Sequence, residues 1–186
     1  LRNRGIIVET ADICRLEPEF QDAVDTFSKK SVQAIVTLHL AYSPSLESIN
    51  SLLSTKIPLI VLNTTPDFPF GPTQLPERIS YNHGIHGVQD MCSMLVRNNR
   101  QFSIESGHWE KSDVIDRVIN RIRGIAAAES FKGSKIGILG EPFAGMGDFQ
   151  IEPDALKEEY GIEILTFEEE KSSVSGKTIR SIEEEL

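Results

Sequence analysis

The chain has 186 residues, 39% of them hydrophobic and 25% charged, which suits a globular protein with one ordinary domain and part of another. The net charge of −9 comes without a basic stripe, which argues against nucleic acid as a partner, and no apolar stretch approaches the roughly 20 residues that span a membrane. The two cysteines, Cys14 and Cys92, lack the spacing of a metal site, so we expect reduced thiols in a cytoplasmic protein.

Short apolar runs alternate with amphipathic helical patterns along the first two thirds of the chain. In chain order, the sequence predicts a strand at 5–8, a helix at 17–30, a strand at 34–38, a helix that begins at Ser43 and Pro44, a strand at 57–62, a helix at 87–98, a strand at 101–105 and a helix from Ser112 to residue 131. Because strands that alternate with helices form parallel βαβ units, we expect a doubly wound parallel sheet of the flavodoxin or Rossmann type, with helices on both faces.

A second unit begins near residue 133, where the charge of the chain changes. Residues 134–186 hold 13 acidic and 5 basic residues, a net charge of −8. The predicted elements of this part are a strand at 135–140, a helix at 152–160 that ends at Gly161, and a strand at 162–166. We therefore divide the chain into an N-terminal α/β domain at 1–133, which lacks an opening strand, and the beginning of a second α/β domain at 134–186. We expect the chain to be a piece of a longer protein.

All four histidines follow a segment that the sequence predicts to be extended. They are His39, His83, His86 and His108, and the segment before the middle two is 79–81. Ligands of open parallel sheets bind beyond the carboxyl ends of the strands, so these side chains predict a polar rim there. In the alternative interpretation, histidines are simply tolerated in loops, and His108 packs against the start of a helix.

The run from Tyr81 to Gly87 reads Tyr-Asn-His-Gly-Ile-His-Gly and stands at the start of a helix. Its glycines let the backbone approach a ligand closely, and its histidines can bond a polar ligand or move a proton near neutral pH. His83 and His86 are three residues apart, but no carboxylate or cysteine lies near them at a spacing typical of zinc. We therefore expect no metal site in this run.

The glycine-containing loop at 140–149 is a second candidate binding site. It lacks the third glycine and the lysine of phosphate-binding loops, which disfavours a nucleotide as its ligand. Its Met146 suits contact with the apolar face of a sugar or a partner if the side chain is exposed, and fills the core if it is buried. The sequence leaves both interpretations open.

Five motifs follow one another along the chain and are considered together. They are the Tyr81–Gly87 run with the helix that follows it, Leu38-His39-Leu40-Ala41-Tyr42-Ser43-Pro44, Asn63-Thr64-Thr65, Ser106-Gly107-His108-Trp109, and the long helix from Ser112. Taken together, they resemble the N-terminal domain of the L-fucose/L-arabinose isomerase family. The resemblance covers most of residues 31–133 and continues into 140–149.

The resemblance implies a cytoplasmic, homo-oligomeric, manganese-dependent aldose–ketose isomerase, a trimer or hexamer that acts on a small sugar. It implies that His86 is a histidine that one subunit contributes to the sugar pocket of its neighbour. Tyr42 then forms an aromatic wall of the pocket, and Met146 lies near the substrate. His83 stands where arabinose isomerases carry glutamine, which argues against L-arabinose, and His39 joins these expected sugar-binding residues through the motif that it shares with Tyr42.

The family's metal ligands and catalytic carboxylates lie further along the chain than residue 186. The resemblance therefore implies Mn²⁺ in the intact enzyme, but no metal ligand, no catalytic residue and no activity in this chain alone. Two alternatives remain. One is a sugar-binding module of the periplasmic or repressor type, which has two α/β domains and no catalysis; the other is a purely structural or assembly domain.

Overall fold

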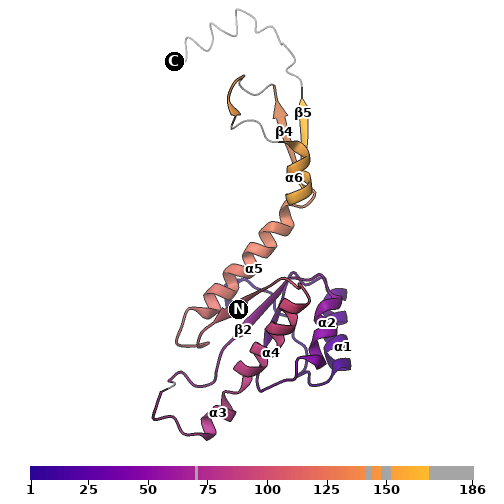
Figure 1. Cartoon of the computed structure of the whole chain (residues 1–186). Helices are drawn as coiled ribbons and strands as arrows, with labels where there is room; N and C mark the ends of the chain where they lie inside the picture. Colours follow the sequence, from indigo (N-terminus) through magenta and orange to yellow (C-terminus); the bar gives the residue numbers. More distant parts are fainter. Residues whose placement is uncertain (70, 141–143, 148–151, 168–186) are drawn as a thin grey trace, which may run out of the picture. The chain divides into compact units, whose positions relative to one another are not determined.

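The computed structural model describes residues 1–69, 71–140, 144–147 and 152–167, and the chain divides into two compact units, Leu1–Ala127 and Ala128–Leu186 (Figure 1). The elements of the first unit are, in chain order, the 3₁₀-helix η1 (Arg2–Arg4), α1 (Glu17–Lys29), β1 (Ile35–Leu38), α2 (Leu46–Ser54), β2 (Leu59–Asn63), α3 (Glu77–Tyr81), α4 (Gly84–Arg97), β3 (Phe102–Ser106) and α5 (Val114–Phe131). The last turn of α5 belongs to the second unit.

The three strands of the first unit form one parallel sheet in the order β1-β2-β3. Its register places Val36 beside Ile60, and Ile60 beside Ser103. Because α2 connects β1 to β2, and α3 and α4 connect β2 to β3, each pair of neighbouring strands belongs to a βαβ unit. The predicted α/β class with a parallel sheet is confirmed.

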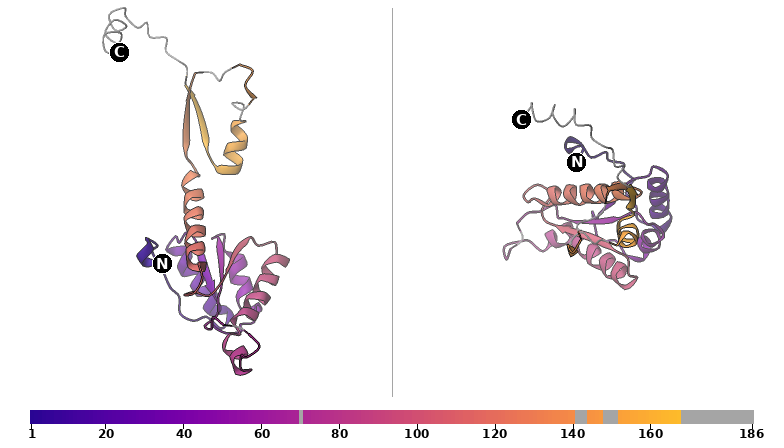
Figure 2. Two further views of the ribbon diagram at one scale, coloured as in Figure 1. Left: turned by 90° about the vertical axis from the view of Figure 1, so that its left-hand side faces the viewer. Right: turned by 90° about the horizontal axis from the view of Figure 1, so that it is seen from above.

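Helices cover both faces of this sheet, as the view from above shows (Figure 2). On one face, Leu59 and Val61 pack with buried side chains of α1, α2 and α4, namely Val24, Ile49, Leu52, Val88, Met91 and Leu95. On the other face Ile60 is fully buried, and Glu105 accepts a hydrogen bond from Arg117, which places α5 on that side. Burial of apolar surface on both faces is the main force that holds the sheet and helices together.

The strand predicted at 5–8 is wrong. After η1, residues 6–15 have no regular secondary structure, and Ile7 is 91% exposed. A β-branched run forms a strand only where a neighbouring strand takes its backbone hydrogen bonds, and among the described residues β1 pairs with β2 alone. The beginning of the chain contacts α5 through an ion pair between Arg4 and Asp116 and a hydrogen bond from Arg123 to the Arg4 carbonyl at 3.2 Å.

The second and third long helices begin at other residues than predicted. The first residue of α2 is Leu46, so Ser43 does not cap it, and the side chain of Ser45 makes no capping bond either. The Ser45 N–H donates to Asp90 Oδ2 at 3.0 Å, and this bond holds the residues before α2 in a loop against α4. In contrast, α4 begins at Gly84, three residues earlier than predicted.

The second unit contains β4 (Lys135–Leu139), α6 (Pro153–Tyr160) and β5 (Glu163–Phe167), and its two strands form a small parallel sheet. As predicted, α6 ends at Gly161, whose φ of 69° is in the left-handed region that favours glycine. Residues 168–186 of the predicted second domain, and parts of the loop at 140–149, lie outside the described residues. Within the described ranges, no helix is long and apolar enough to cross a membrane.

Candidate functional site

The segment before the middle two histidines is helical, so the prediction of an extended run at 79–81 is wrong. The apolar residues there have no neighbouring strand, and the backbone bonds itself locally, with the Asn82 N–H donating to the Arg78 carbonyl at 3.0 Å. His83 is the N-cap residue of α4, and His86 lies in the first turn of that helix. These two histidines therefore lie at a helix start and not directly beyond a strand.

The structure nevertheless brings three rings together from two segments that are distant in sequence. The ring centroids of Tyr42 and His83 are 5.3 Å apart, and those of His83 and His86 are 4.4 Å apart. Tyr42 belongs to the loop after β1, whereas the histidines begin α4. Tyr42 is 48% exposed and His86 is also exposed, so the cluster presents an aromatic ring and imidazole nitrogens to solvent. We call Tyr42, His83 and His86 the ring cluster.

The two glycines of α4's first turn make this arrangement possible by close packing within the chain. A Cβ on Gly84 would lie 2.4 Å from the carbonyl oxygen of His39. A Cβ on Gly87 would lie 2.8 Å from Cδ2 of His39 and 3.0 Å from the backbone nitrogen of Ser43. From the sequence alone, these glycines predict a close approach of the backbone to a ligand. The close approach that the structure shows is to the chain's own loop after β1.

His39 lies in this contact between the loop and α4. Burial lowers the pKa of its imidazole, which favours the neutral form at pH 7. Its Nδ1 atom is buried and has no hydrogen-bond partner within the described part of the chain. An unpaired buried nitrogen of this kind costs roughly 1–3 kcal/mol. His39 therefore packs behind the ring cluster, where its contacts with Gly84 and Gly87 position the loop that carries Tyr42.

A polar junction joins the loop after β2 to the start of α4, and sequence reasoning missed it. Asn82, only 2% exposed, accepts a hydrogen bond from the Asp67 N–H at 3.0 Å and donates to Asp67 Oδ2 at 2.8 Å. Arg78 donates to the same carboxylate at 2.7 Å through Nε. The hydrogen bonds from Arg78 and Asn82 hold the pKa of Asp67 below its usual range. No sequence periodicity relates these positions, so only the fold reveals the junction.

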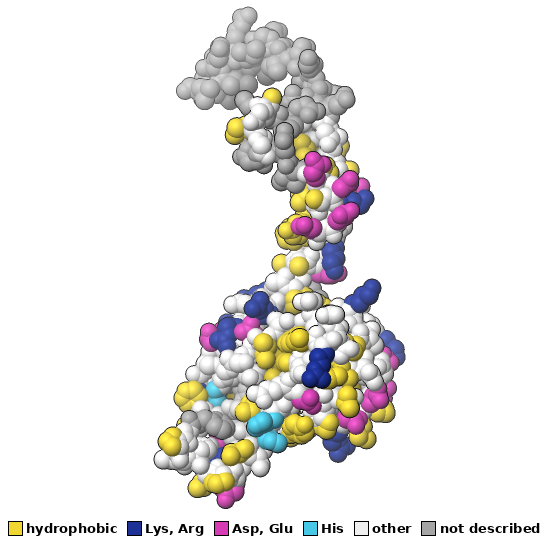
Figure 3. All heavy atoms as spheres, in the orientation of Figure 1, with side chains coloured by type: hydrophobic (Ala, Val, Ile, Leu, Met, Phe, Trp, Pro, Cys, Tyr) yellow, Lys and Arg dark blue, Asp and Glu magenta, His cyan; other side chains and the backbone are white. Residues whose placement is uncertain are grey.

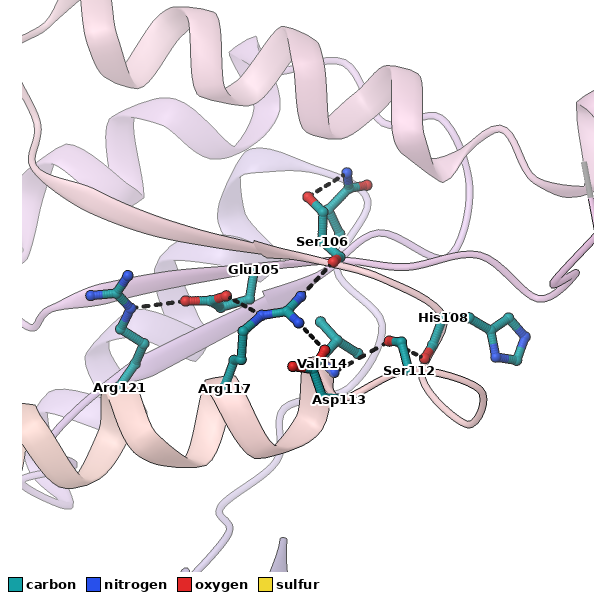
Figure 4. Close-up of polar contacts among 9 residues, drawn as sticks. Glu105, Ser106, His108, Ser112, Asp113, Val114, Arg117 and Arg121 are labelled. Carbon is teal, nitrogen blue, oxygen red and sulfur yellow. Dashed lines mark hydrogen bonds and ion pairs between the residues drawn. The ribbon is translucent and has the colours of Figure 1, made fainter.

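His108 is fully engaged in holding its own loop. Its Nδ1 accepts hydrogen bonds from the N–H groups of Glu110 and Lys111, both at 3.1 Å, and its Nε2 lies 3.3 Å from the Pro66 carbonyl oxygen. This pattern fits the neutral tautomer with the proton on Nε2. Figure 4 shows the ring pointing away from the start of α5, where Ser112 donates to the His108 carbonyl at 2.8 Å. Both ring nitrogens serve the fold.

Met146 lies in the second unit, in the part of the loop between β4 and α6 that the structure describes. Its side chain is 46% exposed, so it does not fill a core. The assignment of Met146 to a sugar site stays a prediction. No group of three or more histidine, cysteine, aspartate or glutamate side chains within the described ranges is arranged to hold a metal ion.

Two members of the ring cluster, Tyr42 and His86, are exposed. Two hollows on the described surface are lined by other residues: one by Glu105, Arg117, Asn120 and Arg121, the other by Leu1, Arg2, Asn3, Val8 and Thr10. In the space-filling view, histidine side chains gather in two places on one face, each with hydrophobic side chains close by (Figure 3). An open cluster of rings contacts one side of a ligand and needs a further surface to enclose it.

No known protein family matches this chain, and no curated protein matches it in sequence. The resemblance to the L-fucose/L-arabinose isomerase family therefore rests on the ordered motifs alone and stays a prediction.

Proposed function

We propose that this chain is part of a metal-dependent aldose–ketose isomerase that resembles the L-fucose/L-arabinose isomerases, and that Tyr42, His83 and His86 form one wall of its sugar-binding site. The observation that carries the proposal is the ring cluster itself. Two motifs that are about 40 residues apart and that both support the resemblance meet in the fold, with ring centroids 4.4 and 5.3 Å apart.

The chemistry of the cluster suits a sugar. The face of the Tyr42 ring packs against the C–H groups of a sugar ring, while imidazole nitrogens of His83 and His86 donate to or accept from its hydroxyl groups. His39 acts behind them as a positioning residue. Because discrimination between sugars rests on a few such hydrogen bonds, His83 and His86 are the residues of this chain that would select the substrate.

The openness of the cluster supports a role in an assembly. A wall that covers one side of a sugar leaves the other side to a second surface, and the resemblance implies that a neighbouring subunit supplies it. We therefore propose a cytoplasmic homo-oligomer, a trimer or hexamer, in which the ring cluster of one subunit closes the pocket of another. Nucleic acid and membranes are not proposed partners, given the acidic net charge of −9 and the absence of a spanning helix in the described residues.

The described residues do not fit a manganese site, since no group of three suitable ligands occurs among them. The proposal therefore assigns the Mn²⁺ ligands and the catalytic carboxylates to parts of the protein or assembly outside the described residues. In this proposal, the role of the present chain is to bind and orient the sugar.

The test is a ketose-formation assay on the intact protein that contains this chain, with L-fucose, L-arabinose and related aldoses, in Mn²⁺ and after chelation. We expect Mn²⁺-dependent turnover, and we expect His86→Ala to lower kcat/KM by about tenfold or more, equivalent to the loss of one or two good hydrogen bonds. Gln89→Ala, an exposed substitution on the same helix, is the matched control and should leave kcat/KM unchanged. Metal-independent sugar binding without turnover on any aldose would refute the isomerase and favour a sugar-binding module.

A further inference from the structure

A second group of rings lies at the carboxyl ends of β2 and β3. Phe68 belongs to the loop after β2, and His108 and Trp109 belong to the loop after β3. The His108 ring stacks on the Trp109 ring with centroids 5.9 Å apart and an interplanar angle of 26°. The Phe68 ring also contacts the His108 ring, edge to face, with centroids 5.5 Å apart and an interplanar angle of 78°. We call Phe68, His108 and Trp109 the aromatic platform.

Hydrogen bonds fix the His108 ring and the backbone of Trp109 in place. The backbone N–H of Trp109 donates to Thr64 Oγ1 at 3.0 Å, which ties the loop after β3 to the loop after β2. His108, in the middle, uses its two ring nitrogens to hold the Pro66 carbonyl on one side and the backbone of Glu110 and Lys111 on the other. A ligand that packs against these rings therefore meets a surface that is already formed, so little conformational entropy is lost on binding.

The two outer rings of the platform, which both contact the His108 ring, are exposed. Phe68 is 59% exposed and Trp109 is 53% exposed. Large aromatic side chains gain most by burial, so two exposed ones that flank the same hydrogen-bonded histidine mark a surface that receives a ligand. Glu110 and Lys111 follow Trp109 directly, and their side chains lie 3.8 Å apart and are both exposed. They add a carboxylate acceptor and an ammonium donor beside the rings.

The aromatic platform is connected to the ring cluster through the polar junction described above. Phe68 follows Asp67, His83 follows Asn82, and Asp67 and Asn82 are hydrogen-bonded to each other. The two groups of rings are therefore held by one hydrogen-bonded junction.

We infer that the aromatic platform is a second carbohydrate subsite, at which the apolar face of a pyranose ring packs on the Trp109 indole. The choice of a sugar as ligand rests on the proposed function. Glu110 and Lys111 then bond the hydroxyl groups at the edge of the sugar ring, while Phe68 borders the platform. Two exposed rings present far less surface than the roughly 800 Å² that each partner buries in a stable protein interface, which favours a small ligand over a second protein.

Trp109 is the single tryptophan of the chain, so its fluorescence reports directly on the aromatic platform. The experiment titrates the full chain with methyl α-L-fucopyranoside, a pyranose that cannot isomerise, and with the open-chain alditol L-fucitol, while tryptophan emission is recorded. We expect a saturable emission change with the pyranoside and none with the alditol, because only the closed ring has a flat apolar face. Phe68→Ala should weaken the apparent affinity about three- to tenfold, the usual contribution of one aromatic contact.

The control for the other site is His86→Ala, which should leave the fluorescence titration unchanged. Trp109→Ala, introduced into the His86→Ala variant, tested by saturation-transfer NMR on the same pyranoside and checked for folding by circular dichroism, should abolish the signal that survives in His86→Ala alone. No emission change at pyranoside concentrations up to about 100 mM, well above a millimolar dissociation constant, would overturn the inference. So would an emission change that follows protein concentration without sugar, since it would mark an interface between copies.

The two proposals fail separately. If the intact protein isomerises no aldose but Trp109 still reports pyranoside binding, the carbohydrate subsite stands and the isomerase does not. If isomerase activity depends on His86 but Trp109 emission ignores every pyranoside, the isomerase stands and the second subsite does not.

Discussion

The backbone N–H of Ser45 donates a 3.0 Å hydrogen bond to the Asp90 carboxylate, and this bond joins the loop after β1 to α4. The loop carries Tyr42, and α4 begins with His83 and His86, so Asp90 helps to hold the ring cluster together from behind. Asp90 therefore acts as a positioning residue. Because Asp90 comes four residues after His86 on α4, the helical repeat places these two residues on the same side of the helix.

Replacing Asp90 tests this connection. Asp90→Ala leaves the Ser45 N–H without its acceptor and should lower the free energy of unfolding by about 1 kcal/mol, measured by urea denaturation. Asp90→Asn keeps an oxygen acceptor at the same place and should lose less. Equal losses in the two variants would show that the hydrogen bond is not what joins the loop to the helix.

The close packing of α4 against the loop gives a sharper test at Gly87. A Cβ there would lie 2.8 Å from the His39 ring and 3.0 Å from the Ser43 nitrogen, so Gly87→Ala must push the loop away and should destabilise the fold by roughly 1–3 kcal/mol. Gly124→Ala is the matched control, because Gly124 lies inside α5 and a Cβ there would meet nothing within 4 Å. Alanine is the better helix former, so this control should gain about 0.5–1 kcal/mol. A gain at Gly87 as well would contradict the packing.

The prediction of helices and strands succeeded where the hydrophobic pattern is periodic. It failed where the pattern is not periodic. The spacing of Val24 and Phe27 on α1, and the β-branched run that forms β2, predict a helix and a strand that the structure confirms. Residues 5–8 have the composition of a strand, but a strand also needs a neighbour for its backbone hydrogen bonds. Residues 79–81 include the bulky apolar side chains of Ile79 and Tyr81, but their backbone takes part in local helical bonds, such as those from the Asn82 N–H to the Arg78 and Ile79 carbonyls.

The candidate site was predictable only in part. The sequence proposes Tyr42 and His83 for one sugar site from the resemblance, and the structure brings their rings together. Asp90 and Asn82, which hold the surrounding segments, escape notice because each bonds a residue 15 or more positions away. Contacts of that range depend on how the loops fold over the sheet, and a single sequence has no local signal for them.

His39 predicts a pH dependence of stability near neutrality. Burial lowers its pKa below the ordinary value of 6.5, so between that value and its own pKa the unfolded chain binds more protons than the folded one. Stability should therefore fall as the pH drops below about 6.5 and should stop falling on this account once the folded imidazole is also protonated. The variant His39→Asn cannot titrate there. The free energy of unfolding of this variant should therefore change less than that of the wild type between about pH 7.5 and about pH 5.5. These two pH values lie about one unit above and below the ordinary histidine pKa of 6.5.

The contact between β3 and α5 predicts a second pH dependence, in the acid range. Hydrogen bonds from Arg121 and Arg117 lower the pKa of the buried Glu105 carboxyl, so its stabilising contribution is complete above the unfolded pKa and is lost as the pH falls through the folded one. Glu105→Gln should therefore be less stable than the wild type at pH 7, and the difference should shrink steadily below about pH 4.5. Glu129→Gln removes an exposed pair with Lys132 and should track the wild type, because exposed ion pairs contribute little. A constant deficit for Glu105→Gln from pH 7 to about pH 3 would show that Glu105 stabilises the contact by packing and not by its charge.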